Sequence, residues 1–562
     1  MSLIRRRPFT RRSRTGCRTC RIRHVKCDET PGACRNCSDN GWACEGYELN
    51  RLPRRAPPPI PSSSPASSTS PPSITPAPIA TGFRWATTAD EKRCVSFFLY
   101  RTIPGLTSFN DSSLWQKLVL QMSCTEPAVY HAVVALSAVN QDLERHGIPR
   151  PGTNPDSTWH RFALEQSMRS FGLLNKRSLL QDPQLREVLL VCCLLFIMLE
   201  LVCGHYDDAT AHLQNGLAIL KEMKIQRRLQ GASPAVIEDN LLDAFLHLES
   251  QATHHGVRQP PLHLDARLIH EQRYEEYLFE FTTLRDAQQA LSPLMNTTFP
   301  FLERCWSRPE AEIMATYGTL HAKQQRLLSC ITQFGTYFDQ FREHYYTTLT
   351  RKQQRGADLI RVMYLTLVLN TKICLYTRGC PEPDWFMSGF EQLLTETLVI
   401  IDGFEERPLM TIDATILPAL FTVAARCPDY TLRYQAIDAL RAWPHCEGYL
   451  NSSFMAELIE EGMKGELRHL WSEVQADACP LPAGLSFEIL KNGGVVACIG
   501  SKGTPATRFL SLETNVALRD ALMTVESSPE WSCVRASGIL PRKGRSERGN
   551  KKFLAMYNEA SI

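Results

Sequence analysis

The sequence has no long hydrophobic run, which argues against a membrane-spanning helix. Its most apolar stretch, Val188 to Leu199, is only 12 residues long and is followed by Glu200, whereas a spanning helix needs about 20 apolar residues. The N-terminus also lacks the apolar segment of a secretory signal. We therefore expect an intracellular chain that does not enter a membrane and whose thiols stay reduced.

The common catalytic motifs are absent as well. The chain contains no H-E-x-x-H, no G-x-S-x-G and no G-x-x-x-x-G-K-[ST], and the Gly-rich stretch 494–502 lacks the spacing of a phosphate loop. His131, His205 and His212 fall beside apolar residues on predicted helices, where we expect core or surface roles rather than metal binding or catalysis. The sequence therefore predicts that the protein is not an enzyme.

Neither sign of charge is in large excess over the whole chain, but positive charge is in excess in its first part. The net charge is only +3, yet residues 1–55 hold 14 Lys or Arg against 5 Asp or Glu. A short basic head on a mildly acidic body indicates a module that binds a polyanion, joined to a part with a different task. We expect residues 1–16 to form a basic disordered tail suited to nuclear import or phosphate contact.

No coiled-coil heptads follow the basic head. Residues 53–80 contain ten Pro and seven Ser, which predicts an extended linker over 48–86 and rules out a coiled coil there. From 87 to 478 apolar residues recur at helical spacing and strand-like alternation is almost absent, which predicts an all-α body. Within this body, Gly204 is expected to end one helix and begin a tight turn to the next. Other helices are predicted near 313–348, 355–378, 385–403, 409–426, 430–443 and 452–474.

The last segment, 479–562, has a different pattern. Two apolar runs that flank Lys491-Asn-Gly-Gly suggest a β-hairpin with an Asn-Gly turn. Beyond Thr504 the sequence becomes polar and basic, and we expect disorder. The pattern assigns this tail no task.

Six of the twenty cysteines lie in the basic head with regular spacing. They are Cys17, Cys20, Cys27, Cys34, Cys37 and Cys44, and they read C-x2-C-x6-C-x6-C-x2-C-x6-C. Zinc in a structural site takes four ligands. Six thiolates therefore serve two zinc ions only when two sulfurs are shared. The two ions would replace the hydrophobic core that so short a segment cannot build.

Three other interpretations fit the cysteines less well. A disulfide framework needs an oxidising compartment, to which nothing points. A redox C-x-x-C motif would need a surrounding βαβ pattern. Buried free thiols do not account for symmetrical spacing in a polar, basic segment.

These residues resemble the fungal binuclear zinc-cluster transcription factors. The match runs from Gly16 to Tyr47 and includes Asp28, Glu29 and Pro31. The resemblance implies that Cys17 and Cys34 bridge the two zinc ions, with Cys20 and Cys27 completing one site and Cys37 and Cys44 the other. Parts of the body, including Trp115 to Leu136, are similar to the fungal-specific regulatory domain found behind such clusters, which implies an all-helical regulatory domain.

DNA is the partner that the basic residues of the cluster indicate. Arginine can donate two parallel hydrogen bonds to guanine in the major groove. In the resembled family, two adjacent basic residues read a CGG triplet, and these correspond to Arg23 and His24, where relatives more often carry Lys or Arg at the second position. We expect phosphate contacts from the remaining basic residues, which are Arg18, Arg21, Lys26 and Arg35. A solvated basic face is the plainer alternative.

The predicted architecture is a small zinc-nucleated module of two short helices (17–47), followed by a large all-α regulatory domain built as a helical array. The predicted function is a nuclear, sequence-specific transcription factor for RNA polymerase II genes. Its other candidate partners are co-regulators or the transcription machinery, a second copy through the helical domain, and a small-molecule effector. The alternative is a regulatory or scaffold protein that acts through its helical body with weak or no DNA binding, because one module that reads three base pairs gives little affinity.

Overall fold

The computed structural model describes a large part of the 562-residue chain. The described residues are 15–47, 52, 85, 87–151, 153, 156–179, 185–230, 236–254, 280–308, 310–375, 385–412, 416–475, 481–482, 484–491, 494–500 and 507–513. Most of the predicted basic tail and Pro/Ser-rich linker lie outside these residues. So do the Asn-Gly turn and the C-terminal residues beyond 513. Their predicted character stays a prediction, as do the domain boundaries.

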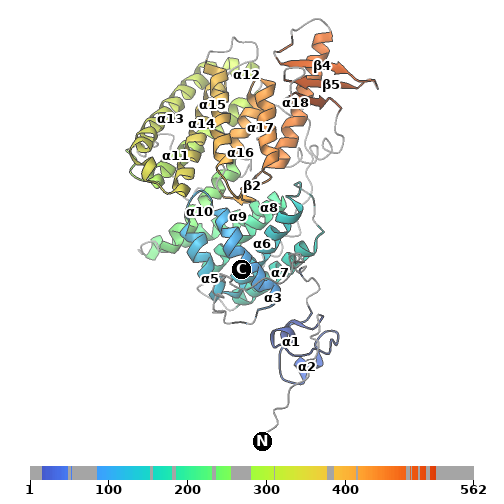
Figure 1. Cartoon of the computed structure of the whole chain (residues 1–562). Helices are drawn as coiled ribbons and strands as arrows, with labels where there is room; N and C mark the ends of the chain where they lie inside the picture. The colour runs from blue at the N-terminus through green and yellow to red at the C-terminus, as the bar shows by residue number, and fades with distance from the viewer. Residues whose placement is uncertain are drawn as a thin grey trace, which may run out of the picture. The chain divides into compact units, whose positions relative to one another are not determined.

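The chain forms two compact units. The first consists of Met1–Thr102, Lys117–Arg145 and Asn154–Leu195, and the second of Ile103–Gln116, His146–Thr153 and Phe196–Ile562. Helices dominate the described residues of both units, and strands are few (Figure 1). A small N-terminal module with two short helices, followed by a mostly helical body, confirms the predicted fold class.

In the first unit, two short helices belong to the cysteine-rich module and longer helices build the rest. The elements are α1 (Arg18–Ile22), α2 (Arg35–Ser38), α3 (Ala89–Phe97), η1 (Phe98–Thr102), η2 (Leu114–Leu118), α5 (Val119–Thr125), α6 (Pro127–His146), α7 (Thr158–Leu179) and α8 (Leu185–Cys203). Of these, η1 and η2 are π-helical, and η2, α6 and α8 extend partly into the second unit. Helix α6 is central, because every residue from Ala128 to Leu143 is buried. A helix surrounded in this way must pack against other elements on all sides.

The second unit holds the remaining helices and all the described strands. The helices are α4 (Ile103–Leu106), α9 (Tyr206–Gln230), α10 (Val236–His254), α11 (Leu284–Ser307), α12 (Glu310–Ala315), α13 (Tyr317–Tyr345), the 3-10 turn η4 (Tyr346–Thr348), α14 (Arg351–Ile373), α15 (Trp385–Asp402), α16 (Ile416–Arg426), α17 (Tyr430–Ala442) and α18 (Ser452–Gln475).

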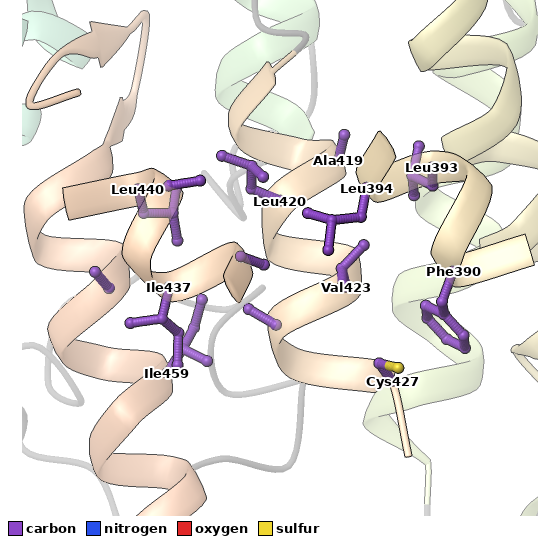
Figure 2. Close-up of a cluster of buried hydrophobic side chains, with 14 of the residues drawn as sticks. Phe390, Leu393, Leu394, Ala419, Leu420, Val423, Cys427, Ile437, Leu440 and Ile459 are labelled. Atoms are coloured by element: carbon purple, nitrogen blue, oxygen red, sulfur yellow. The ribbon is translucent and has the colours of Figure 1, made fainter. Parts of the chain in front are cut away.

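Helix α14 lies between two hydrophobic cores of the second unit. Leu359 and Val362 pack into one core, and Ile360 and Met363 pack into the other. The first core gathers side chains from α15, α16, α17 and α18, as Figure 2 shows around Val423. The second core is built mainly by α11, α13 and α14. A helix with two apolar faces joins these layers into one unit.

Two small sheets complete the second unit. Strands β1 (Met410–Thr411), β2 (Cys446–Glu447) and β3 (Leu450–Asn451) form one sheet, in which β1 and β2 are parallel. Strands β4 (Leu485–Ile489), β5 (Val495–Ile499) and β6 (Arg508–Ser511) form an antiparallel sheet. The β4–β5 pair is the hairpin suggested by the sequence, whereas the third strand was not expected.

Local signals account for several helix ends. Gly204 adopts φ +77°. The N–H groups of Gly204 and His205 bond the carbonyls of Leu201 and Glu200, which closes α8 in a Schellman motif as the sequence predicts. Helix α16 is different, because residues 410–411 pair with β2 instead of extending the helix back to 409. In the described part of the chain, no helix is both long and apolar enough to cross a membrane.

Candidate metal centre and nucleic-acid interface

Four buried cysteine sulfurs of the N-terminal module lie in mutual contact. The Sγ of Cys17 is 3.5 Å from that of Cys34 and 3.7 Å from that of Cys37. The Sγ of Cys20 is 3.6 Å and 3.8 Å from the same two atoms. All of these cysteines are free thiols rather than disulfides, and the separations are far above an S–S bond. Four converging sulfurs are the donors that a zinc ion prefers.

The two halves of the module repeat one hydrogen-bonding pattern. Cys17 caps α1 and accepts from the N–H of Cys20 at 3.3 Å, and Cys34 caps α2 and accepts from the N–H of Cys37 at 3.3 Å. The third cysteine of each half follows the same rule. Its sulfur accepts a hydrogen bond from the backbone N–H of the first cysteine of the same half. The N–H of Cys17 donates to Cys27 at 3.3 Å, and the N–H of Cys34 donates to Cys44 at 3.4 Å. The repeated C-x2-C-x6-C spacing of the sequence is therefore matched by a repeated local structure.

Protonation of these thiols shows why the donor set needs a cation. Burial is the main influence on Cys17 and Cys34, and it raises the pKa of both thiols well above the usual range. Burial also opposes ionisation of Cys27 and Cys44, but backbone N–H donors outweigh it and lower the pKa of both. Zinc ions supply the positive charge that holds such sulfurs as thiolates. The residues present thus fit a binuclear zinc cluster.

Other residues of the Gly16–Tyr47 match hold the loops of the module. Asp28 accepts from the backbone N–H groups of Arg35 and Asn36, both at 3.1 Å, at the start of α2. Hydrogen bonds from Thr30 and from these N–H groups keep the pKa of Asp28 well below its usual value. The hydroxyl of Tyr47 donates to the carbonyl of Thr30 at 2.7 Å. These contacts tie the loop between the two halves to both of them.

Both short helices of the module end in the same way. The N–H of Val25 bonds the carbonyl of Cys20, and the N–H of Trp42 bonds the carbonyl of Cys37. His24 and Gly41 occupy the left-handed position before them, with φ values of 57° and 68°. This is the Schellman motif, in which glycine is usual at that position. His24 therefore closes the end of α1, directly after Arg23.

Five of the six residues predicted to contact DNA retain solvent access. Arg21 and Arg23 are half-buried, whereas His24, Lys26 and Arg35 are exposed. Arg23, His24 and Lys26 all lie within four residues at the end of α1.

The sixth residue, Arg18, lies in a different environment. It is 5% exposed and donates to both carboxylate oxygens of Glu91, each at 2.9 Å, as well as to Glu45. Glu91 is fully buried at the start of α3. Burial opposes the charge on Arg18, but the two carboxylates outweigh it and raise its pKa. A phosphate contact by Arg18 would require this ion pair to open.

The structure also brings a residue that the sequence did not single out next to Arg23. The guanidinium carbon of Arg23 lies 4.4 Å from the centre of the Trp42 ring. Trp42 is 53% exposed, which is unusual for so large an aromatic residue. The eight-residue offset from the first cysteine of each half relates Trp42 to Val25, and this offset is the signal by which its position could have been noticed.

The three histidines considered in the body occupy structural positions. His131 and His212 are buried, and burial lowers the pKa of both. His205 bonds Glu200 at 2.8 Å across the turn after α8, and this bond raises its pKa. Asp208 lies close enough to complete a group of three metal-binding side chains with His205 and Glu200. The hydrogen bond between His205 and Glu200 holds two of these three side chains together at the helix junction.

Comparison with known proteins agrees with the geometry. Residues 15–53 match the fungal Zn(2)-Cys(6) binuclear cluster domain, and residues 93–253 match the fungal specific transcription factor domain. The chain is 25% identical over 425 residues to the aspercryptin biosynthesis cluster-specific transcription regulator atnN of Emericella nidulans, a match that covers 71% of this chain and 65% of that protein.

Two further relatives match shorter stretches. The transcription regulator lscL of Purpureocillium lilacinum is 28% identical over 232 residues, 40% of this chain and 54% of its own. White-opaque regulator 2 of Candida albicans is 50% identical over 52 residues, 9% of this chain and 12% of its own. The matches to the first two relatives thus span less than two thirds of their lengths. No solved structure matches the chain.

The sulfurs of Cys17, Cys20, Cys34 and Cys37 form a cluster, which we call the sulfur cage. This cage accounts for the zinc-cluster match, and the helical body that follows it in the chain accounts for the second domain match. With these two domains in this order, the chain has the domain arrangement of the fungal zinc-cluster transcription regulators, and the relatives named above are fungal transcription regulators.

Proposed function

We propose that the protein binds specific DNA sequences and regulates RNA polymerase II genes in the nucleus. The observation that carries this proposal is the row of accessible basic side chains, Arg23, His24 and Lys26, at the end of a helix anchored to the sulfur cage. Basic residues on a rigid support are the usual means of binding a duplex in register.

In this proposal Cys17 and Cys34 bridge the two zinc ions, and Arg23 reads guanine in a CGG-type triplet of the major groove. An arginine fork matches the O6 and N7 acceptors of guanine. His24 lies next to it and contacts the neighbouring base. Arg21, Lys26 and Arg35 contact phosphates, which sets the position of the module without reading sequence.

In this proposal, the helical body has the regulatory role. A single module that reads three base pairs binds weakly, so pairing of two copies through the body and contacts with co-regulators or the transcription machinery would supply the remaining affinity and the output. A small-molecule effector is a candidate input to the same body. The proposal assigns the chain no catalytic activity.

The test uses full-length, zinc-loaded protein and two duplexes of equal length, one containing CGG and one with that triplet scrambled. We expect Arg23→Ala to weaken binding to the CGG duplex by about 1–3 kcal/mol and to change binding to the scrambled duplex little. Arg35→Ala should weaken binding to both duplexes alike, because a phosphate contact carries no sequence information.

Arg351→Ala is the matched control, because this arginine is 87% exposed and far along the chain from the module. It should change neither affinity. Equal losses on both duplexes for Arg23→Ala would reduce Arg23 to a phosphate contact. If the wild-type protein binds neither duplex, the chain acts mainly through its helical body and the alternative function holds.

A further inference from the structure

Trp42 is an exposed aromatic residue that zinc binding does not require. Its backbone N–H bonds the carbonyl of Cys37 at 2.9 Å, directly after Gly41 at φ 68°. This bond closes the Schellman motif at the end of α2 and so fixes where the indole begins. The side chain is nevertheless 53% exposed, and leaving so much apolar surface in water is unfavourable. Its position therefore calls for a role on the surface of the module.

The guanidinium of Arg23 supplies that role. Its central carbon lies 4.4 Å from the Trp42 ring centre, well within the range of a cation–π contact. Among the described residues, the Arg23 side chain makes no hydrogen bond and no ion pair, and its Nη1 atom is covered without a partner. Within the described part of the chain, the specific contact that the guanidinium of Arg23 makes is thus the one with the ring of Trp42.

The edge of Arg23 that stays open is the one suited to a base. Nε and Nη2 are not among the buried atoms without a partner, so they retain solvent access while Nη1 is covered. These two N–H groups lie side by side in the plane of the guanidinium and form a fork. Such a fork can donate to the O6 and N7 acceptors of guanine in parallel.

We infer that Trp42 is a positioning residue for DNA reading, which holds the Arg23 fork open and oriented before DNA arrives. This inference rests on the proposed function, because it assigns Trp42 a part in sequence reading by Arg23. An unsupported arginine loses much rotamer freedom when it is ordered on a base. Stacking on the ring orders the side chain beforehand, so binding to the cognate triplet loses less entropy.

The test is a double-mutant cycle between positions 23 and 42 in full-length, zinc-loaded protein, on the CGG and scrambled duplexes. Trp42→Leu keeps apolar bulk but removes the aromatic face, and it should weaken binding to the CGG duplex about 2- to 5-fold while binding to the scrambled duplex stays unchanged. Trp42→Phe keeps an aromatic face and should retain most of the affinity. In an Arg23→Ala background, Trp42→Leu should have no further effect.

Val25→Ala is the matched control, because Val25 occupies the equivalent position after α1 and is 40% exposed. It should leave the preference for CGG unchanged. The zinc content of every variant, measured by native mass spectrometry, should stay at two ions per chain, so that a loss of preference is not a loss of the cluster.

The outcomes separate the inference from the proposed function. If Arg23→Ala removes the preference for CGG but Trp42→Leu weakens binding equally in both backgrounds, or equally on both duplexes, then Trp42 does not act through Arg23. The inference is then overturned and the proposed function stands. If Arg23→Ala leaves the preference intact, both the inference and the assigned reading role of Arg23 are overturned.

Discussion

The guanidinium of Arg18 in the zinc module donates to both carboxylate oxygens of Glu91, 73 residues further along the chain. Both side chains are buried. Glu91 also accepts from the N–H of Thr88, so the same carboxylate caps α3 and pairs with the module. A buried charge whose partner is removed is costly, because neither water nor an opposite charge then compensates it.

Glu91→Gln should therefore lower the free energy of unfolding by about 3 kcal/mol, although it keeps the shape and the capping contact. The measurement is the midpoint of urea unfolding. Glu405→Gln is the control, because Glu405 pairs with Arg351 at the surface, where both are over 85% exposed, and exposed pairs contribute little. Arg18→Met together with Glu91→Gln should recover part of the loss. If Glu91→Gln shifts the midpoint of urea unfolding no more than Glu405→Gln does, the Arg18–Glu91 pair contributes nothing to stability.

Arg18 shows what the sequence could and could not predict. Its place directly after Cys17 makes it look like its basic neighbours, and nothing local separates an ion-paired arginine from one that contacts phosphate. The partner Glu91 lies beyond the Pro-rich linker, and such a distant pairing leaves no periodic signal. The cysteine spacing, by contrast, predicts the sulfur cage because four-ligand zinc geometry fixes it.

Zinc removal should unfold the module and spare the body. Five cysteines form the buried core of the module, and Cys44 and Tyr47 pack against them. The two cores of the second unit contain none of the module's six cysteines. Structural zinc contributes on the order of 10 kcal/mol to folding in small modules. Chelation should thus release two zinc ions per chain, measured by mass spectrometry, with little loss of far-ultraviolet helical signal.

Cys20→Ser should reproduce the zinc loss, and Cys124→Ser should not, because Cys124 is a partly exposed cysteine outside the module. A large loss of helical signal on chelation would mean that the body depends on the cluster for its fold.

The pH dependence of stability should include a contribution from His131. Burial lowers the pKa of this imidazole below its usual value of 6.5, against the opposing influences of Glu91 and Gln166. The unfolded chain therefore takes up the proton more readily than the folded one. The contribution of His131 to the free energy of unfolding is therefore complete above about pH 6.5, and it is lost as the pH falls toward the pKa of His131 in the folded chain.

His131→Gln removes the titrating group, so its unfolding midpoint should fall less than that of the wild type between pH 7.5 and 5.5, two values chosen to bracket about 6.5. His469→Gln, at a side chain 77% exposed, should follow the wild type. The comparison between variants isolates His131 from the release of zinc in acid, which all three proteins share. Parallel curves for His131→Gln and the wild type would contradict the prediction.

The start of α16 shows a second limit of sequence reasoning. Apolar spacing predicts a helix from 409, but the helix begins at Ile416. Its first N–H groups, those of Ile416 and Leu417, donate to the carboxylate of Glu447 at 3.2 and 3.0 Å. The cap therefore comes from β2, some thirty residues later in the chain, and no local capping motif announces it. By contrast, the Thr350–Gln353 capping box at the start of α14 is local and could have been read.

Glu447→Ala should consequently destabilise the second unit by about 2 kcal/mol, because it leaves two buried helix-terminal N–H groups without an acceptor. The effect should be large for a single residue since α16 packs at the centre of a core (Figure 2). Glu447→Gln should lose less, because one amide oxygen still accepts. Asp438→Asn is the control, as its pair with Arg508 is half-exposed. Urea unfolding followed by tryptophan fluorescence would rank the three variants, and an Ala variant no less stable than Asp438→Asn would show that water replaces the cap.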